Sequence, residues 1–303
     1  MAMPAALSYA KDLQRAHERA ATDSRIAQTA KGPIEYSVLG QGPAVLLAHG
    51  AGGGFDQMLE FAAELAAGGF RVVAMSRFGY LRTPLPPDAS PAAQADAHAA
   101  LLDALGIDRA AIIGISAGAP SSLQFALRYP ARCDALVLLV PLAYSPPPTG
   151  QPAPALTPVA RFVFEKTLKS DFLFWVLSRG AQRLLVKTVL ATPPRLLHGA
   201  SADERRRVRG IIEHILPVSE RQQGMLNDAS IGASLPRYEL ERIAARTLVI
   251  SAADDLYGTY VSARYTAEHL PNARFIGYAA GGHVWVGHHR EILSEIRTFL
   301  RPQ

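Results

Sequence analysis

The spacing of apolar residues divides the chain into segments of different kinds. Residues 7–20 place apolar side chains at helical spacing, which predicts an amphipathic N-terminal helix. Residues 24–29 and 34–38 alternate apolar and polar positions on either side of a Gly-Pro turn at residues 31–33, as the strands of a hairpin do. From residue 44 onward, short continuous apolar runs appear, which are typical of strands buried on both faces of a sheet.

These apolar runs alternate with helical patterns, which predicts a mostly parallel sheet with helices on both faces. The predicted strands are residues 44–48, 70–74, 111–115, 135–140, 247–251 and 274–278, and the predicted helices are residues 91–105, 119–128, 260–269 and 288–300. The alternation stops at a Pro-rich stretch, residues 145–148, and residues 153–230 then show only helical patterns. A helical block between two sheet strands predicts an inserted cap, or lid.

The predicted organisation is therefore an α/β core interrupted by a helical cap. Residues 1–22 form an N-terminal helical extension, residues 23–145 and 241–303 form the core, and residues 146–240 form the cap. Hydrophobic residues make up 49% of the 303 residues and charged residues 19%, which is enough apolar material for a buried core. The N-terminal helix could serve as a lid element, a homodimer contact or a surface anchor.

Composition excludes several classes of protein. A single cysteine, Cys133, can form neither an internal disulfide nor a cysteine-rich zinc site. No apolar run is long enough to span a bilayer, and the charged N-terminal residues do not resemble a signal peptide. Arginine is far more frequent than lysine, a hint of a GC-rich bacterial genome. We therefore expect a bacterial cytoplasmic protein with no integral membrane span.

The net charge of +5 comes from the predicted cap. Residues 146–240 hold 13 Lys and Arg against 8 Asp and Glu, and the rest of the chain holds 18 of each. The run at residues 204–209 is the one basic cluster of the sequence, whereas a nucleic-acid-binding protein would show a denser basic stripe. We expect no nucleic-acid partner, and we predict that this run is the solvated face of a helix.

A G-x-S-x-G pattern at residues 114–118 lies between a predicted strand and a predicted helix. A sharp strand-to-helix turn, the nucleophile elbow, strains the backbone of the serine and exposes its hydroxyl, while the glycines let strand and helix approach closely. Ser116 is therefore a candidate nucleophile. The alternative is an ordinary glycine-rich turn with an incidental serine.

A serine hydroxyl is a poor nucleophile until a base removes its proton. His283 is the candidate base, because it follows two glycines in a loop after a predicted strand. His288 and His289 begin the last predicted helix and are expected to face solvent. His49 adjoins a glycine-rich loop and is expected to organise that loop rather than to act as a base.

The acid that orients the base should follow another strand. Asp254 and Asp255 come directly after the strand predicted at residues 247–251. A solvated turn or a helix cap is the alternative reading of paired aspartates. The order Ser…Asp…His favours the catalytic interpretation, although the spacing alone does not separate the two aspartates.

The glycine-rich loop, residues 49–54, follows the strand predicted at residues 44–48. Small residues there would let backbone N–H groups approach a ligand and hold an oxyanion, together with the N–H of Ala117, the residue after the candidate nucleophile. A phosphate-binding loop is the competing interpretation, but the G-x-x-x-x-G-K-[ST] and G-x-G-x-x-G patterns are not matched.

Together, the H-G-x loop, the G-x-S-x-G turn, the acid after the penultimate strand and the G-G-H near the end resemble the α/β-hydrolase family. In the resemblance, nucleophile, base and orienting acid fall on Ser116, His283 and Asp255. Asp255 occupies the position of the aspartate in the family's G-x-x-D pattern. The oxyanion hole falls on the N–H groups of Ala51 and Ala117, with Gly52 as an alternative donor.

The resemblance implies an esterase-like serine hydrolase with a helical cap, which cleaves carboxylic esters of small to medium hydrophobic substrates through an acyl-enzyme. This chemistry needs no metal or other cofactor. A C–C bond hydrolase, a lactonase and a cofactor-free perhydrolase use a similar triad and are alternatives, and a ligand receptor with a slow triad is one of another class. A hydrophobic substrate is favoured by the aromatic residues of the predicted cap, Phe162, Phe164, Phe172, Phe174 and Trp175.

The sequence departs from the family pattern after the strand predicted at residues 70–74. The family often has D-x-x-G-x-G there, whereas this chain has Ser76 in place of the aspartate and keeps the glycine of the turn as Gly79. The aspartate is structural in the family, so its absence leaves the proposed chemistry intact. Arg77, Phe78 or Tyr80 could, however, lie differently near the site.

Overall fold

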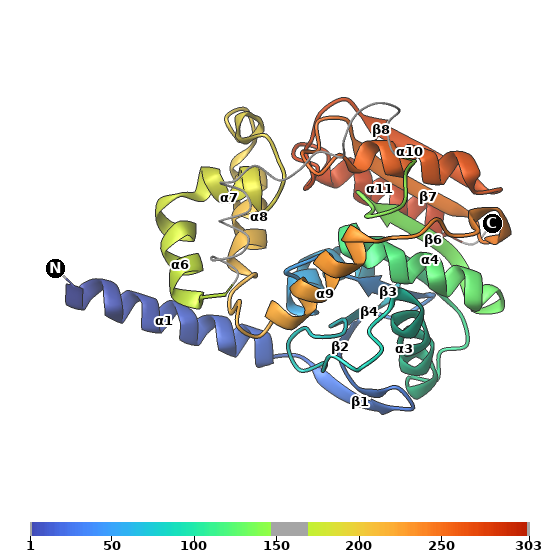
Figure 1. Cartoon of the computed structure of the whole chain (residues 1–303), viewed down its shortest axis with the longest axis horizontal. Helices are drawn as coiled ribbons and strands as arrows, with labels where there is room; N and C mark the ends of the chain where they lie inside the picture. The colour runs from blue at the N-terminus through green and yellow to red at the C-terminus, as the bar shows by residue number, and fades with distance from the viewer. Residues whose placement is uncertain (1, 147–168, 302–303) are drawn as a thin grey trace.

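The computed structural model describes residues 2–146 and 169–301, and its centre is an eight-stranded sheet with the order β1-β2-β4-β3-β5-β6-β7-β8 (Figure 1). The strands are β1 (Arg25–Thr29), β2 (Gly32–Leu39), β3 (Ala44–Ala48), β4 (Arg71–Met75), β5 (Ala110–Ile115), β6 (Cys133–Leu139), β7 (Thr247–Ala252) and β8 (Ala273–Tyr278). β2 pairs antiparallel with β1 and β4, and β3 to β8 pair in parallel. The predicted hairpin and parallel sheet are confirmed.

The apolar runs of the sequence become strands whose side chains feed two separate cores. Successive side chains of a strand point to opposite faces, so Leu46 of β3 lies in one apolar cluster and Leu47 in the other. Every residue of β5 and β7 is buried. This burial on both faces explains why these strands read as continuous rather than alternating apolar runs.

Helices cover both faces of the sheet. They are α2 (Leu59–Ala66), α3 (Pro91–Ala104), α4 (Ala119–Arg128), α10 (Thr259–His269) and α11 (His289–Leu300). α3, α4 and α10 pack on the face that includes Leu46, and α2 and α11 pack on the face that includes Leu47. The short helix α2 is absent from the predicted elements, because its eight residues give too brief a helical pattern to stand out.

The chain between β6 and β7 contributes α6 (Asp171–Gly180), α7 (Gln182–Thr188), α8 (Ala202–Glu213) and α9 (Gln222–Ala233). We call the described part of this region, residues 169–239, the inserted segment. In Figure 1, α6, α7 and α8 stand to one side of the sheet, whereas α9 lies against the core. Part of the predicted Pro-rich linker, and Phe162 and Phe164, lie outside the described residues.

Helix α1 (Ala2–Ala21) packs on the inserted segment (Figure 1). The indole N–H of Trp175 donates to Asp12 at 2.8 Å, and the Tyr9 ring meets Trp175 edge-on at 5.4 Å. Arg19 donates to the backbone carbonyls of Glu213 and Leu216. The N-terminal extension therefore joins the inserted segment through polar and aromatic contacts. None of the helices that the structure describes combines the length and the apolar character that a bilayer crossing requires.

Candidate functional site

Ser116 lies where β5 ends and α4 begins, in a left-handed backbone conformation with φ of 49°. This conformation is costly for a residue other than glycine and is typical of functional turns. The two glycines of the pattern permit the turn. A Cβ on Gly118 would lie 2.2 Å from the carbonyl oxygen of Ala48, and one on Gly114 would lie 2.5 Å from the Ser122 hydroxyl. Close packing of strand and helix thus requires glycine at both positions.

Three loops at the carboxyl edge of the sheet bring Ser116, His283 and Asp255 together. The Ser116 Oγ is 2.9 Å from His283 Nε2, and His283 Nδ1 is 2.8 Å from Asp255 Oδ2. An ionised carboxylate only accepts hydrogen bonds, so it selects the His283 tautomer with the proton on Nδ1. The unprotonated Nε2 can then accept the proton of the Ser116 hydroxyl.

Asp255 is buried and fully hydrogen-bonded. The N–H of Tyr257 donates to Asp255 Oδ1 at 2.9 Å, and the hydroxyl of Thr259 donates to Oδ2. Burial by itself would raise the pKa of Asp255, but His283 and these two donors outweigh it and lower the pKa. Sequence reasoning missed both donors. An aspartate that accepts from the N–H two residues ahead is a recognisable turn signal and could have identified Tyr257.

Asp254, the neighbour of Asp255, has a different set of contacts. Its Oδ1 accepts the backbone N–H groups of Gly281 at 2.9 Å and of Gly282 at 2.7 Å. The two aspartates thus have different roles beside His283. Asp255 contacts the ring, and Asp254 holds the loop from which the ring projects.

The glycine-rich loop follows β3 and passes beside Ser116. A Cβ on Gly50 would lie 3.2 Å from the Cβ of Ser116, so the loop approaches the serine closely. Ala51 lines the same cavity as Ser116, and Ala117 is buried at the start of the turn into α4. The N–H of Gly52 faces the hydroxyl of Tyr80 at 3.4 Å instead, which disfavours Gly52 as an alternative oxyanion donor.

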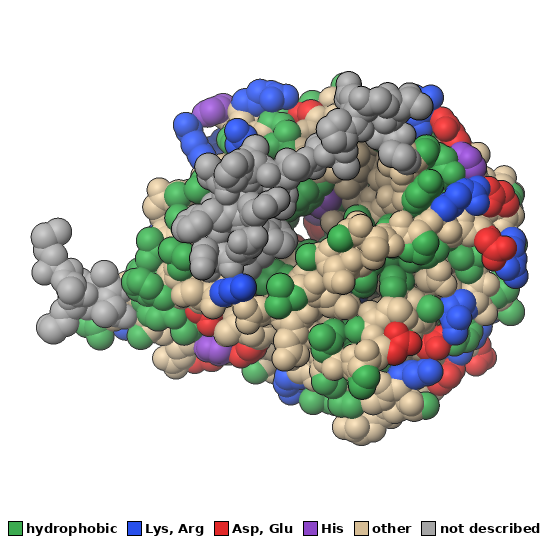
Figure 2. Space-filling view, in the orientation of Figure 1, with side chains coloured by type: hydrophobic (Ala, Val, Ile, Leu, Met, Phe, Trp, Pro, Cys, Tyr) green, Lys and Arg blue, Asp and Glu red, His purple; other side chains and the backbone are tan. Residues whose placement is uncertain are grey.

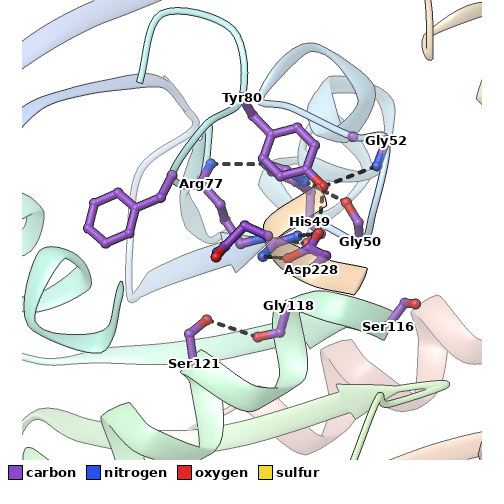
Figure 3. Close-up of polar contacts among 12 residues, drawn as sticks. His49, Gly50, Gly52, Arg77, Tyr80, Ser116, Gly118, Ser121 and Asp228 are labelled. Carbon is purple, nitrogen blue, oxygen red and sulfur yellow. Dashed lines mark hydrogen bonds and ion pairs between the residues drawn. The ribbon is translucent and has the colours of Figure 1, made fainter. Parts of the chain in front are cut away.

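His49, at the start of this loop, is completely buried. Its ring lies beside Tyr80 and Arg77 (Figure 3). The backbone N–H of Arg77 donates to His49 Nε2 at 3.0 Å, so the ring proton is on Nδ1 and donates to the carbonyl of Gly50 at 2.7 Å. Burial and the neighbouring Arg77 charge hold the pKa of His49 well below its usual value. His49 is thus a neutral residue that fixes the shape of the loop.

A cavity of about 130 Å³ opens above Ser116 and His283. Its wall is mostly apolar: Met58, Phe61 and Ile115 come from the core, and Val189, Leu190, Ile211 and Ile215 come from the inserted segment. Three of the aromatic residues that favoured a hydrophobic substrate are described, Phe172, Phe174 and Trp175, and none of these three lines the cavity. Phe172 and Trp175 pack on Tyr9 instead, so the aliphatic residues make the cavity apolar. Figure 2 shows a hollow in this face of the molecule.

Arg207 and His289, which were expected to face solvent, also line the cavity. The guanidinium of Arg207 pairs with Glu204, both side chains being about 90% buried, and it lies 5.6 Å from the Trp285 ring. His289 pairs with Glu64 at 2.8 Å. The solvated-face prediction therefore holds for Arg205, Arg206 and Arg209 but is wrong for Arg207, and the same expectation is wrong for His289. Turns of α8 and α11 point these two side chains inward.

A cluster of His, Cys, Asp or Glu side chains could also mark a metal site. In residues 2–146 and 169–301, no three His, Cys, Asp or Glu side chains are arranged to hold a metal ion. The contacts around Ser116 instead form one continuous hydrogen-bonded line from a carboxylate to a hydroxyl.

Residues 43–286 match a family model described as alpha/beta hydrolase fold. The uncharacterized hydrolase YcgS of Bacillus subtilis is 26% identical over 270 residues, which is 84% of this chain and 90% of that protein. The 2-hydroxy-6-oxo-6-phenylhexa-2,4-dienoate hydrolase of Comamonas testosteroni is 32% identical over 113 residues, but this is 36% of this chain and 40% of that protein. A solved alpha/beta hydrolase fold protein from Nakamurella multipartita has a TM-score of 0.73 and 28% identity, covering 91% of this chain and 98% of that one.

Proposed function

Because the chain belongs to the alpha/beta hydrolase fold family, we propose that it is a serine hydrolase that cleaves carboxylic esters of small to medium hydrophobic substrates. One observation carries the proposal. A buried carboxylate, an imidazole and a hydroxyl form a line with heavy-atom distances of 2.8 Å and 2.9 Å at the floor of an apolar cavity. Such a line is what a serine nucleophile needs in order to be activated.

In the acylation step, His283 Nε2 accepts the proton of Ser116 as its oxygen attacks the ester carbonyl. The resulting oxyanion accepts hydrogen bonds from the N–H groups of Ala51 and Ala117. The imidazolium is stabilised by ionised Asp255, whose lowered pKa keeps it charged at neutral pH. His283 then gives its proton to the departing alcohol, and an acyl-enzyme remains.

In the deacylation step, water takes the place of the alcohol. His283 removes a proton from the water, whose oxygen attacks the acyl carbonyl, and the same two N–H groups stabilise the second oxyanion. The proton returns from His283 to Ser116 as the carboxylic acid leaves. Every proton is carried by a side chain of this chain, and no metal or cofactor takes part.

The size and charge of the cavity guide the choice of substrate. A volume of about 130 Å³ is close to that of an engineered apolar cavity of roughly 150 Å³ that binds benzene. We expect an acyl or alcohol group of about that size. We assign the role of a cap to the aliphatic wall that comes from α8 and from the residues just after α7 and α8. Arg207 is already paired with Glu204, which favours an uncharged substrate over a carboxylate.

The test is hydrolysis of p-nitrophenyl esters of increasing acyl length by the wild-type protein and by Ser116→Ala. We expect kcat/KM to fall by about 10⁴–10⁶ in Ser116→Ala and the wild type to prefer acyl groups of up to about six carbons. Ser178→Ala, which removes a hydroxyl bonded to the carbonyl of Trp175, is the matched control and should behave as wild type. Equal hydrolysis by wild type and Ser116→Ala would refute the proposal.

Carbon–carbon bond hydrolysis is the second candidate, because the Comamonas testosteroni relative is named for a dienoate. Such a substrate carries a carboxylate, and the pairing of Arg207 with Glu204 argues against it. The same two variants distinguish the candidates. Cleavage of 2-hydroxy-6-oxo-6-phenylhexa-2,4-dienoate far faster than of any ester, and lost in Ser116→Ala, would favour the second candidate over the first.

A further inference from the structure

One face of α9 carries Gly224 and Asp228. Arg221, the residue just before the helix, lies on the same face, because the three residues are separated by three and four positions. Arg221 and Asp228 are both buried charges. Helix α9 belongs to the inserted segment, but this face meets the core, on the loops that follow β3 and β4. The mechanism above gives these three residues no role.

Asp228 joins the inserted segment to the glycine-rich loop through Arg77 (Figure 3). The guanidinium of Arg77 binds both carboxylate oxygens of Asp228, at 2.8 Å and 2.6 Å. The same guanidinium donates through Nε to the carbonyl of His49 at 2.7 Å, and the backbone N–H of Arg77 donates to the His49 ring. Because the Arg77 guanidinium is rigid and planar, Asp228 fixes its position, and Arg77 in turn fixes His49, the first residue of the loop.

Tyr80 makes a second connection between Asp228 and the loop. Its hydroxyl donates to Asp228 Oδ2 at 2.5 Å and faces the N–H of Gly52 at 3.4 Å, while its ring meets the His49 ring edge-on at 4.7 Å. The ring lies directly against α9, because a Cβ on Gly224 would come within 2.1 Å of it. Glycine at this position lets the helix approach closely enough for Asp228 to reach Tyr80.

Arg221 makes a third connection, one residue before the start of α9. Its guanidinium pairs with Asp56 at 2.7 Å and donates to the carbonyl of Gly53 at 2.6 Å, and both side chains are completely buried. The inserted segment therefore supplies a cation, Arg221, and an anion, Asp228. The core supplies their partners, Asp56 and Arg77. The glycine-rich loop is held at His49, Gly52 and Gly53, on both sides of Ala51.

We propose that Asp228, with Arg77 and Tyr80 as its partners, positions the N–H of Ala51 for the oxyanion. Asp228 is a positioning residue because it acts only through Arg77 and Tyr80. An oxyanion hole works only if its donors are held within about 0.5 Å of the productive place. Desolvating two charges offsets most of what a buried ion pair returns in stability, so the arrangement fits a requirement for geometry better than one for stability. This inference rests on the proposed serine hydrolase mechanism.

The test compares two Tyr-Asp-Arg clusters of the same chain. Tyr80→Phe and Asp228→Asn alter the cluster on the loop. Tyr129→Phe and Asp96→Asn are the matched controls, because Asp96 likewise binds a tyrosine hydroxyl at 2.8 Å and an arginine at 2.7 Å, but at the far end of α4. The measurements are kcat and KM for the best p-nitrophenyl ester, and the inhibition constant of phenylboronic acid, whose adduct with Ser116 is a tetrahedral anion.

We expect kcat to fall at least tenfold in Tyr80→Phe and about 100-fold in Asp228→Asn, close to the loss of one oxyanion donor. KM should stay within about twofold, since the cavity wall is unchanged. Boronate affinity should fall by the same factor as kcat, because both the adduct and the transition state place a negative oxygen at the Ala51 N–H. Tyr129→Phe and Asp96→Asn should match the wild type in all three quantities.

Two results would overturn the inference: kcat unchanged in the loop variants, or kcat lowered with boronate affinity unchanged. Tyr80→Phe keeps the aromatic ring and removes one oxygen, so it carries the test if Asp228→Asn does not fold. Ser116→Ala separates a failure of this inference from a failure of the mechanism. If Ser116→Ala hydrolyses the ester as fast as the wild type, the serine mechanism itself fails and this inference fails with it.

Discussion

The two sides of Ser116 are built in different ways. On the base side, His283 and Asp255 project from loops after β8 and β7, and every contact of Asp255 comes from nearby loops or the start of α10. On the oxyanion side, the glycine-rich loop is tied to a helix of the inserted segment through Arg77 and Asp228, which are 151 residues apart in the chain. The inserted segment also contacts the loop of His283, where Thr192 accepts from the N–H of Val284 and Glu204 from the N–H of Gly287. Among the described residues, however, the buried ion pairs between the insertion and the core are on the oxyanion side.

Because of this difference, we expect substitutions on the two sides to affect catalysis and stability differently. A substitution of Asp255 should change the proton transfer and leave the fold nearly intact, because the loops keep their other hydrogen bonds to one another and to the inserted segment. A substitution on the oxyanion side should disturb the contact between two parts of the molecule, because it leaves a buried charge without its partner. On the base side, activity should therefore fall much more than stability. On the oxyanion side, the loss of stability should be the larger one.

The largest effect on activity is expected at Asp255. In Asp255→Asn the amide N–H₂ can donate to His283 Nδ1, which selects the tautomer with the proton on Nε2 and leaves no acceptor for the Ser116 proton. We expect kcat to fall by about 10⁴, as the equivalent change does in a studied serine protease. Unfolding in urea, followed alongside the ester assay, should show a loss of no more than about 2 kcal/mol.

Asp254→Asn is the control for this prediction, since the two aspartates are neighbours. The asparagine oxygen can still accept from Gly281 and Gly282, so the loop loses about 1 kcal/mol of hydrogen bonding and kcat falls no more than about tenfold. If Asp254→Asn proved as damaging as Asp255→Asn, the base side would depend on loop position as strongly as on ring chemistry. The comparison between the two sides would then be wrong.

The same difference explains what could be predicted from the sequence. The strands, the turn at Ser116 and the loop at His283 are encoded by short motifs and apolar runs, and their predicted positions agree with the structure to within two residues for most strands. The choice of Asp255 over Asp254 came from a family pattern, because both follow the same strand. In the structure Asp255 faces His283 and Asp254 faces the loop.

The oxyanion side could not be worked out in this way. Arg77 and Tyr80 were noticed as departures from the family pattern, but nothing local indicates that their partner is Asp228. The inward turn of Arg207 was missed for the same reason, because a charged run at the surface and a charged pair in a cavity look alike until the packing of α8 is known. Ion pairs between distant segments have no signature in one sequence.

The largest effect on stability is expected at Arg77. Arg77→Met leaves Asp228 buried and unpaired, which costs about 3–5 kcal/mol. The double variant Arg77→Met with Asp228→Leu removes both charges and should recover most of that free energy of unfolding, since an apolar pair of similar volume can replace a buried ion pair. Its kcat should stay low, because the carbonyl of His49 loses its guanidinium donor in both variants. Urea unfolding and the ester assay on the two variants check this.

Arg128→Met is the matched change on the exposed cluster around Asp96. The Asp96 side chain is 16% exposed against 4% for Asp228, and Arg128 is 43% exposed. Exposed ion pairs contribute about 0–1 kcal/mol, so Arg128→Met should cost no more than that. Equal losses of unfolding free energy in Arg77→Met and Arg128→Met would mean that the ion pair between α9 and the core stabilises the protein no more than an exposed ion pair does.

The smallest effect concerns pH, and it follows from the different neighbours of the histidines on the two sides. His283 faces a carboxylate, whereas His49 faces Arg77. Burial and the Arg77 charge hold the pKa of His49 well below 6.5, and they lower the pKa of His98 to about 3. Both rings therefore stay neutral in the folded protein at a pH where the unfolded chain, with a pKa of about 6.5 for each ring, takes up protons.

The unfolded state thus binds more protons than the native state between about pH 6.5 and the folded pKa values, so stability must fall as pH falls through this window. The slope approaches about 1.4 kcal/mol per pH unit for each histidine. Urea unfolding at about pH 7.5, 6 and 5 avoids most carboxylate titration. His98→Gln, which keeps a polar group beside Ser121, should remove the part of the slope due to His98 and leave the parts due to His49 and to His214, whose pKa burial also lowers. A free energy of unfolding that is constant from pH 7.5 to 5 would show that His49 and His98 both accept protons in the folded protein. The oxyanion side would then lack the rigidity that separates it from the base side.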